Sequence, residues 1–224
     1  MGANTSTFFA HWCGRRIRST ANARAPAEGA GAAALLLALA LPWRFGLLLA
    51  GYVAASVAYS LALKRRLILD VLWLAGLYTA RIFGGSFASG VPVSEWLATF
   101  AMFLFLSLAF LKRASELHHA PSALPRRGYT PDDREAVLAM GTSAGYLSTL
   151  VLALYVSSRE VRRLYRHPEW LWGLCPLVLY WLSMLWIQAR RGNVRGDPLL
   201  HALRYPATWA VVAAAAALVI LGSL

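Results

Sequence analysis

Long apolar runs recur along most of this 224-residue chain, and they restrict the folds that it can adopt. A helix of about 20 apolar residues crosses the ~30 Å hydrocarbon core of a bilayer. No run alternates with the period of two that a membrane barrel strand requires, so we predict an all-α integral membrane protein. The seven predicted spans are Ala30–Leu41, Phe45–Leu63, Leu67–Phe83, Trp96–Leu111, Ala136–Val156, Trp170–Ala189 and Pro206–Leu221.

Composition supports the membrane class and argues against a nucleic-acid-binding protein. The chain is 58% hydrophobic and only 14% charged. Its formal net charge of +12 is compatible with nucleic-acid binding, but the basic residues lie between apolar runs and not on one soluble face. Residues 1–29 form a polar, basic segment without an apolar core, so we identify no secretory signal there and predict a transmembrane domain over residues 30–224.

The basic residues also predict an orientation. With the N-terminus in the cytoplasm, most Lys and Arg residues fall in cytoplasmic segments, as the positive-inside rule requires. The cluster Arg159–Arg166 is the main exception. We therefore expect an integral protein of a bacterial-type plasma membrane with a cytoplasmic N-terminus.

The third predicted span carries an acid, Asp70, and a base, Arg81. Their separation is about three helical turns, or ~16 Å, so they share a helix face but lie too far apart to neutralise each other. Ionisable groups inside a membrane span are costly and indicate a functional site by default. The alternatives are that Asp70 is a first-turn acid stabilised by the helix dipole and that Arg81 extends to the outer interface.

Further candidates stand at the ends of two other spans. Tyr59 and Lys64 close the second span, where an aromatic anchor and a snorkelling lysine are the ordinary interpretation. Lys112, Arg113 and Glu116 close the fourth. Lys112 and Glu116 have the spacing of a helix-surface ion pair, whereas a Lys-Arg pair just under the membrane can also bind a lipid phosphate.

Two acidic motifs are predicted to be helix caps and not metal sites. Thr130 suits an N-cap, Pro131 the first helical position, and Asp132 and Asp133 the first turn. Asp197 before Pro198 has the same pattern. We find no nucleophile-plus-base motif, phosphate-binding glycine loop or zinc signature, and we assign no metal ligand.

The predicted orientation brings several charged segments to the cytoplasmic face: Lys64–Arg66, Asp70, Lys112, Arg113, Glu116 and the loop 126–134. A basic pocket containing a few acids suits a phosphorylated substrate or a lipid phosphate at headgroup depth.

The order and spacing of the motifs resemble the UbiA-type superfamily of intramembrane prenyltransferases, and within it the branch containing decaprenyl-phosphate phosphoribosyltransferase. The resemblance extends from about residue 30 to the end of the chain. It implies a bundle of nine transmembrane helices around a central cavity, of which the seven spans would form a partial version. The motifs are Tyr59–Lys64, Asp70, Arg81 with Gly84-Gly85, Ser94–Trp96, Lys112-Arg113 with Glu116-Leu117, Arg127–Thr130, and Asp197-Pro198.

The resemblance also implies a reaction, in which a polyprenyl phosphate attacks the anomeric carbon of phosphoribosyl diphosphate and diphosphate leaves. The implied partners are a polyprenyl lipid phosphate, a phosphorylated sugar donor and membrane lipids, with no nucleic acid. The implied catalytic residues are Asp70 and Glu116. The implied substrate-binding residues are Tyr59, Lys64, Arg81, Lys112, Arg113 and Tyr129.

The chain departs from this family near its N-terminus. The family uses an aspartate-rich motif, Asn-Asp-x-x-Asp-x-x-x-Asp, to hold Mg²⁺ on the diphosphate, as hard oxygen ligands should. This chain has no Asp or Glu before Glu28. We therefore expect Mg²⁺ from the family but without its main ligand motif. We also expect a truncated or frame-shifted product, or a misplaced start, with little or no transfer activity.

Two alternatives remain open. An aromatic-acceptor prenyltransferase of the same fold would carry further aspartates where Lys112–Glu116 stands. A non-catalytic membrane protein that binds lipid phosphate, such as a lipid carrier or a transporter subunit, would bind without turnover. A transporter often shows matching halves, and none is visible in this sequence.

Overall fold

Six of the predicted spans are helices in the structure, a computed structural model that describes residues 43–119, 128–194 and 197–224. Helices and turns, with no strand, make up the secondary structure of these ranges. The first predicted span, Ala30–Leu41, and the predicted N-terminal segment 1–29 lie outside the described residues.

The six long helices are apolar enough and long enough to cross a bilayer, counted together with their flanking 3₁₀ turns. This part of the chain is therefore an all-helical integral membrane protein by length and composition. The long helices are α2 (Trp43–Leu61), α3 (Leu69–Ser89), α4 (Glu95–His119), α5 (Arg134–Ser157), α7 (Leu174–Arg190) and α9 (Pro206–Ser223). The short elements are η1 (Leu63–Arg65), η2 (Pro131–Asp133), α6 (Arg159–Leu164), η3 (Pro168–Gly173) and α8 (Pro198–Arg204).

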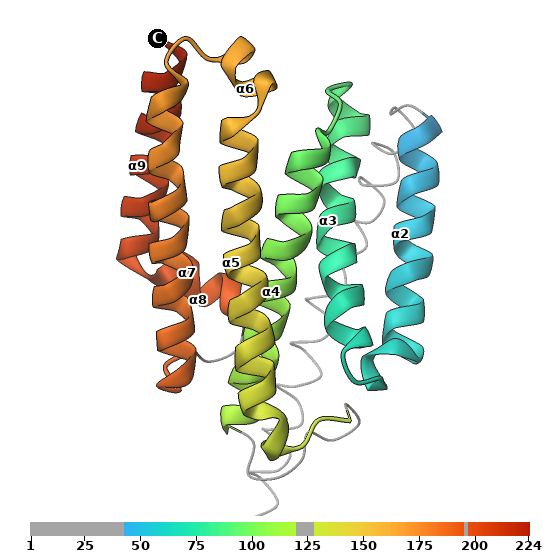
Figure 1. Cartoon of the computed structure of the whole chain (residues 1–224). Coiled ribbons are helices and arrows are strands. Elements are labelled where there is room, and N and C mark those ends of the chain that lie inside the picture. The colour runs from blue at the N-terminus through green and yellow to red at the C-terminus, as the bar shows by residue number, and fades with distance from the viewer. Residues whose placement is uncertain (1–42, 120–127, 195–196) are drawn as a thin grey trace, which may run out of the picture. The chain divides into compact units, whose positions relative to one another are not determined.

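Residues 50–224 form one unit in which successive long helices run in opposite directions. Helix α4 packs between α3 and α5, α5 packs on α7, and α7 packs on α9 (Figure 1). Because the helices alternate, the start of α3, the end of α4, the start of α5 and the end of α7 lie at the same end of this unit. That end carries Asp70, at the start of α3, and Lys112, Arg113 and Glu116, at the end of α4, whereas Arg81 lies three turns further along α3.

Helix α4 continues past its predicted end at Leu111 to His119. Two polar residues in this extension, Arg113 and Ser115, are buried and have partners. The Ser115 hydroxyl donates a hydrogen bond to the Val194 carbonyl at 2.5 Å, and Arg113 is fully enclosed. A hydropathy run therefore underestimates this helix, because its last turns are held by polar contacts inside the protein.

The predicted cap at the start of α5 is confirmed. The Thr130 N–H donates to Asp133 Oδ2 at 2.8 Å in a capping box, and Pro131 occupies the first helical position. These contacts satisfy backbone donors that a helix start leaves without partners. The acids of this motif thus have a structural role at the entrance to α5.

Close packing of α4, α5 and α7 depends on Gly141. A Cβ at this position would lie 2.2 Å from Trp186 Cη2 and 2.7 Å from Phe110 Cβ. Trp186 is held in place, since its indole N–H donates to Ser107 Oγ at 3.1 Å and Ser107 Oγ donates to the Gly141 carbonyl at 2.7 Å.

We expect Gly141→Ala to lower the free energy of unfolding by about 1–3 kcal/mol, the usual cost of overpacking a filled core. Equilibrium unfolding in detergent measures this change. The matched control is Gly76→Ala on α3, where a new Cβ meets nothing within 4 Å. Equal stability of the two variants would contradict the packing described for Gly141.

Candidate functional site: a buried polar network

A buried ion pair joins two of the long helices. Arg113 Nε on α4 donates to Asp70 Oδ2, the second residue of α3, at 2.6 Å. Both side chains are almost completely enclosed, at 1% and 0% exposure. Desolvating two charges is expensive, and such a pair persists only with good geometry and with further hydrogen bonds to the remaining donors and acceptors. The partner that the sequence analysis required for Asp70 is therefore Arg113.

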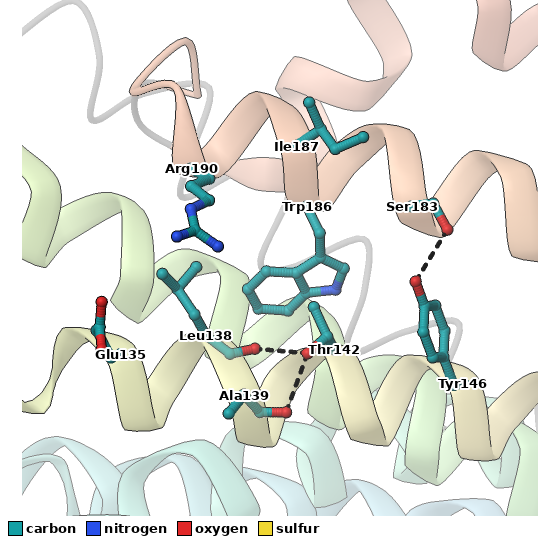
Figure 2. Close-up of a pocket in the computed structure, with 9 residues that line it drawn as sticks. All are labelled: Glu135, Leu138, Ala139, Thr142, Tyr146, Ser183, Trp186, Ile187 and Arg190. Carbon is teal, nitrogen blue, oxygen red and sulfur yellow. Dashed lines mark hydrogen bonds between the residues drawn. The ribbon is translucent and has the colours of Figure 1, made fainter.

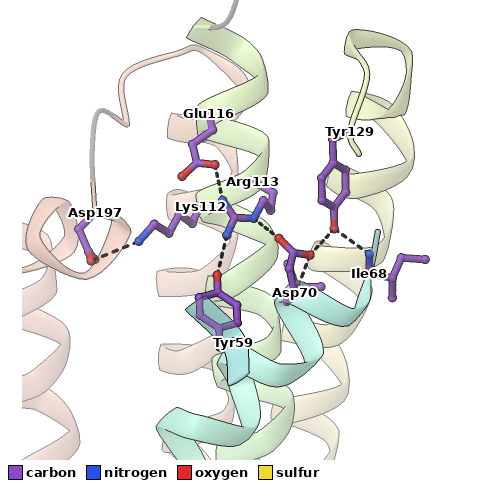
Figure 3. A network of polar contacts seen from close by, with 9 residues as sticks. Tyr59, Ile68, Asp70, Lys112, Arg113, Glu116, Tyr129 and Asp197 are labelled. Carbon is purple, nitrogen blue, oxygen red and sulfur yellow. Dashed lines mark hydrogen bonds and ion pairs between the residues drawn. The ribbon is translucent and has the colours of Figure 1, made fainter. Parts of the chain in front are cut away.

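Those further bonds come from Glu116 and Tyr59. Arg113 Nη1 donates to Glu116 Oε2 one turn along α4, and Arg113 Nη2 donates to the Tyr59 hydroxyl of α2 at 3.3 Å. The planar guanidinium thus connects three helices through different nitrogens, which a lysine ammonium cannot reproduce in the same geometry. Figure 3 shows Arg113 at the centre of these contacts.

Tyr129, from the segment before α5, completes the network. Its hydroxyl donates to Asp70 Oδ1 at 2.8 Å and accepts from the Ile68 N–H at 3.1 Å. Burial, followed by the hydrogen bond to Asp70, raises the pKa of Tyr129 well above its usual range. The hydroxyl therefore keeps its proton and remains a donor to the carboxylate. The preceding Gly128 has a φ of +71°, which favours glycine, and lies against the Arg65 carbonyl.

The backbone just before Asp70 is strained. Ile68 has φ 64° and ψ −41°, and the Leu69 N–H bonds to the Leu67 carbonyl at 2.7 Å across it. This is a γ-turn of the rare, strained kind, at a β-branched residue. Strained residues persist where the surroundings hold them, and they gather at functional sites. The hydrogen bond from Ile68 to Tyr129 is one such restraint.

Lys112 points to the other side of α4 and meets Asp197 across 4.0 Å (Figure 3). Both side chains are about one-third exposed, at 32% and 34%. Asp197 precedes α8, as its predicted role as a cap requires, and its side chain also approaches Lys112. The weak pair leaves Lys112 at the surface beside the network. Lys64, in η1, is half-buried and lies four residues before Ile68.

Arg81 lies apart from the network, three turns further along α3. Its Nη2 donates to the Tyr52 hydroxyl at 2.8 Å, and its guanidinium lies 4.8 Å from the centre of the Tyr78 ring. Cation–π contacts of this kind hold an arginine against aromatic faces. Arg81 thus packs on α2 and α3 in an exposed position.

Five of the eight predicted site residues are therefore in direct contact: Tyr59, Asp70, Arg113, Glu116 and Tyr129. The part played by Ile68 was not predicted, because nothing in the sequence signals its turn. The pairing of Lys112 with Asp197 was not predicted either, because the helix-cap pattern of Asp197 gives no indication of a partner on α4.

The described residues offer no evident magnesium site. They contain no group of three or more His, Cys, Asp and Glu side chains placed to hold a metal ion. Asp70 already uses both oxygens, because Oδ2 accepts from Arg113 and Oδ1 accepts from Tyr129 and from the Val71 N–H at 2.8 Å. We therefore derive no step through Mg²⁺ from this network.

We expect Tyr129→Phe to lower the free energy of unfolding by about 1–3 kcal/mol, because it removes a donor to the buried Asp70 carboxylate and the acceptor of the Ile68 N–H. Unfolding in detergent measures the effect. Tyr180→Phe is the control, since Tyr180 is 56% exposed. If both variants unfold like the wild type, the Tyr129 hydroxyl does not support the network.

Comparisons with known proteins give partial similarities. The chain is 34% identical over 172 residues to an uncharacterized protein, y4nM, of Sinorhizobium fredii, covering 74% of this chain and 33% of that protein. It is 36% identical over 162 residues to nodulation protein NoeC of Azorhizobium caulinodans, covering 69% and 52%. It is 31% identical over 74 residues to decaprenyl-phosphate phosphoribosyltransferase of Mycolicibacterium smegmatis, covering 33% and 23%.

The chain spans between a third and about half of the length of the first two relatives. No protein-family model matches it. In the residues that the structure describes, the chain is an all-helical membrane protein, and a third of the chain is similar to a decaprenyl-phosphate phosphoribosyltransferase.

Proposed function

We propose that this chain belongs to the UbiA-type prenyltransferases and that the network forms one wall of a site for phosphorylated substrates. The proposed reaction joins phosphoribosyl diphosphate and a polyprenyl phosphate. Two findings support this proposal: the partial similarity to the mycobacterial phosphoribosyltransferase, and the position of Lys112 directly beside a buried, multiply bonded arginine. The second finding carries the proposal, because nothing in a simple membrane anchor requires such a network.

In the proposed reaction, a phosphate oxygen of the lipid forms a bond to the anomeric carbon, and the bond from that carbon to diphosphate breaks. Lys64 and Lys112 supply positive charge for the substrate phosphates and for the leaving diphosphate. Arg113 is surrounded by three side-chain partners and therefore acts as a positioning residue for Tyr59 and Glu116. The catalytic role proposed for Glu116 fits its partial exposure of 27%, whereas Asp70 has no exposed surface and acts through Arg113.

The proposed location is a bacterial-type plasma membrane with the network at its cytoplasmic face. This orientation is supported by the basic residues Lys64–Arg66, Lys112 and Arg113, which belong to the same end of the helical unit. Water-soluble phosphoribosyl diphosphate would reach the network from the cytoplasm, and the polyprenyl phosphate would reach it from the adjoining leaflet.

The test is to purify the 224-residue chain in lipid nanodiscs and to measure binding and turnover with labelled phosphoribosyl diphosphate and polyprenyl phosphate. Saturable binding of both supports the proposal, and formation of a lipid-linked phosphoribose would show that the chain is active without the aspartate-rich motif. Binding of the lipid without binding of phosphoribosyl diphosphate would assign the chain to the lipid-phosphate binders. Prenylation of an aromatic acid would instead assign it to the aromatic-acceptor branch. Absence of binding of either phosphorylated compound would refute the proposal.

A further inference from the structure

A second candidate site lies between α5 and α7, and the network residues do not contribute to it. It is a groove of about 410 Å³ (Figure 2). This volume lies in the range of small-molecule sites, which are mostly apolar with a few placed polar groups. Both walls are candidate membrane spans by length and composition, so the surroundings suit a lipid as the occupant.

The floor of the groove is rigid. Trp186 lies across it with 5% of its surface exposed, fixed by its hydrogen bond to Ser107 and by contact with Gly141. Leu138, Ala139 and Ile187 supply apolar walls. The groove is therefore preformed, so a bound chain would not have to order these side chains first.

The two ends of the groove differ in chemistry. At one end stand Glu135, in the first turn of α5, and Arg190, the last residue of α7 (Figure 2). Both are exposed, and neither side chain has an ion pair or hydrogen bond among the described residues. Towards the other end, Tyr146 and Ser183 hydroxyls meet at 3.2 Å. Glu135 and Tyr146 are ~16 Å apart along α5 at 1.5 Å per residue.

We propose that this groove binds one phospholipid with a zwitterionic, amine-bearing headgroup. Arg190 holds the phosphate, Glu135 holds the ammonium, and one acyl chain lies on Trp186 between Ala139 and Ile187. The charges favour this headgroup over that of phosphatidylglycerol, because Glu135 attracts the ammonium, whereas the glycerol is neutral and leaves only the negative phosphate beside Glu135. The groove has a charged end and apolar walls, and a membrane phospholipid has a charged headgroup and apolar acyl chains. The inference is independent of the transferase proposal.

The test uses the full chain in nanodiscs of equal parts phosphatidylethanolamine and phosphatidylglycerol, transferred to mild detergent and analysed by native mass spectrometry. The wild type should retain one phosphatidylethanolamine. Ala139→Trp, which fills the groove, should reduce this retention at least fivefold. Leu147→Trp is the matched control, because Leu147 is also an exposed residue of α5 but does not line the groove. It should retain the lipid.

A second variant tests the headgroup and does not depend on how Ala139→Trp folds. Glu135→Arg places an arginine on both helices at the charged end of the groove. This variant should retain phosphatidylglycerol in preference to phosphatidylethanolamine. The inference is overturned if the wild type retains no lipid or retains phosphatidylglycerol in preference. It is also overturned if Ala139→Trp and Leu147→Trp lose the lipid equally, or if Glu135→Arg leaves the headgroup preference unchanged. A second copy of the chain that closes the groove would overturn it as well.

Discussion

Arg113→Met should lower the free energy of unfolding by about 3–5 kcal/mol, the largest loss of stability that we expect from one substitution. Methionine fills much of the same space but carries no charge. Asp70, which has no exposed surface, would keep its carboxylate inside the protein with hydrogen bonds only from Tyr129 and the Val71 N–H. Equilibrium unfolding in detergent micelles, compared with the wild type, measures this loss.

Two further variants define the origin of that loss. Arg162→Met removes an exposed arginine of α6 and should change stability by less than about 0.5 kcal/mol. The double variant Asp70→Leu/Arg113→Met removes both charges and should recover much of the stability, since an apolar pair of similar volume often replaces a buried ion pair at little cost. A double variant as unstable as Arg113→Met would show that the Asp70 charge is not the cause.

Lys112→Gln should weaken binding of phosphoribosyl diphosphate roughly tenfold to a hundredfold while leaving the fold intact. A hydrogen bond to a charged group contributes about 1.5–3 kcal/mol, and 1.4 kcal/mol is a factor of ten in affinity. The stability cost is small, because the pair with Asp197 spans 4.0 Å and is about one-third exposed. Isothermal titration with the purified chain measures the affinity.

Lys112→Arg keeps the charge and is expected to retain most of the binding. Arg159→Gln removes a cation at the opposite end of α5 and should bind like the wild type. If Lys112→Gln binds phosphoribosyl diphosphate as tightly as the wild type, Lys112 does not contact the substrate, and the phosphate site has to be sought elsewhere.

The sequence predicted those features of this fold that depend on local chemistry. Apolar runs predicted the six described spans, and Thr130 with Pro131 predicted the start of α5, because hydropathy and capping act over a few residues. Asp70 was indicated as an ionisable residue inside an apolar span, and Arg113 and Glu116 were indicated as a charged motif at the end of the fourth span. All of the catalytic and substrate-binding assignments remain predictions, including those of the residues that the network brings together.

Partners distant along the chain could not be predicted. Asp70 and Arg113 are 43 residues apart along the chain. The rotation of α4 against α3 decides that Arg113, and not Lys112, is the partner of Asp70. The strained turn at Ile68 is imposed by its surroundings and runs against the preference of a β-branched residue. The groove between α5 and α7 likewise arises from the packing of Trp186 on Gly141, which appears only once the helices are assembled.

The chain contains only two lysines, Lys64 and Lys112, and this permits a direct test of the phosphate site. Acetylation of the purified chain, followed by mass spectrometry, reports the accessibility of these two side chains separately from each other. With phosphoribosyl diphosphate present, we predict that both lysines become protected from acetylation, and that inorganic sulfate at the same ionic strength protects them far less. Unchanged labelling of both lysines at saturating phosphoribosyl diphosphate would contradict a phosphate site at this end of the helices.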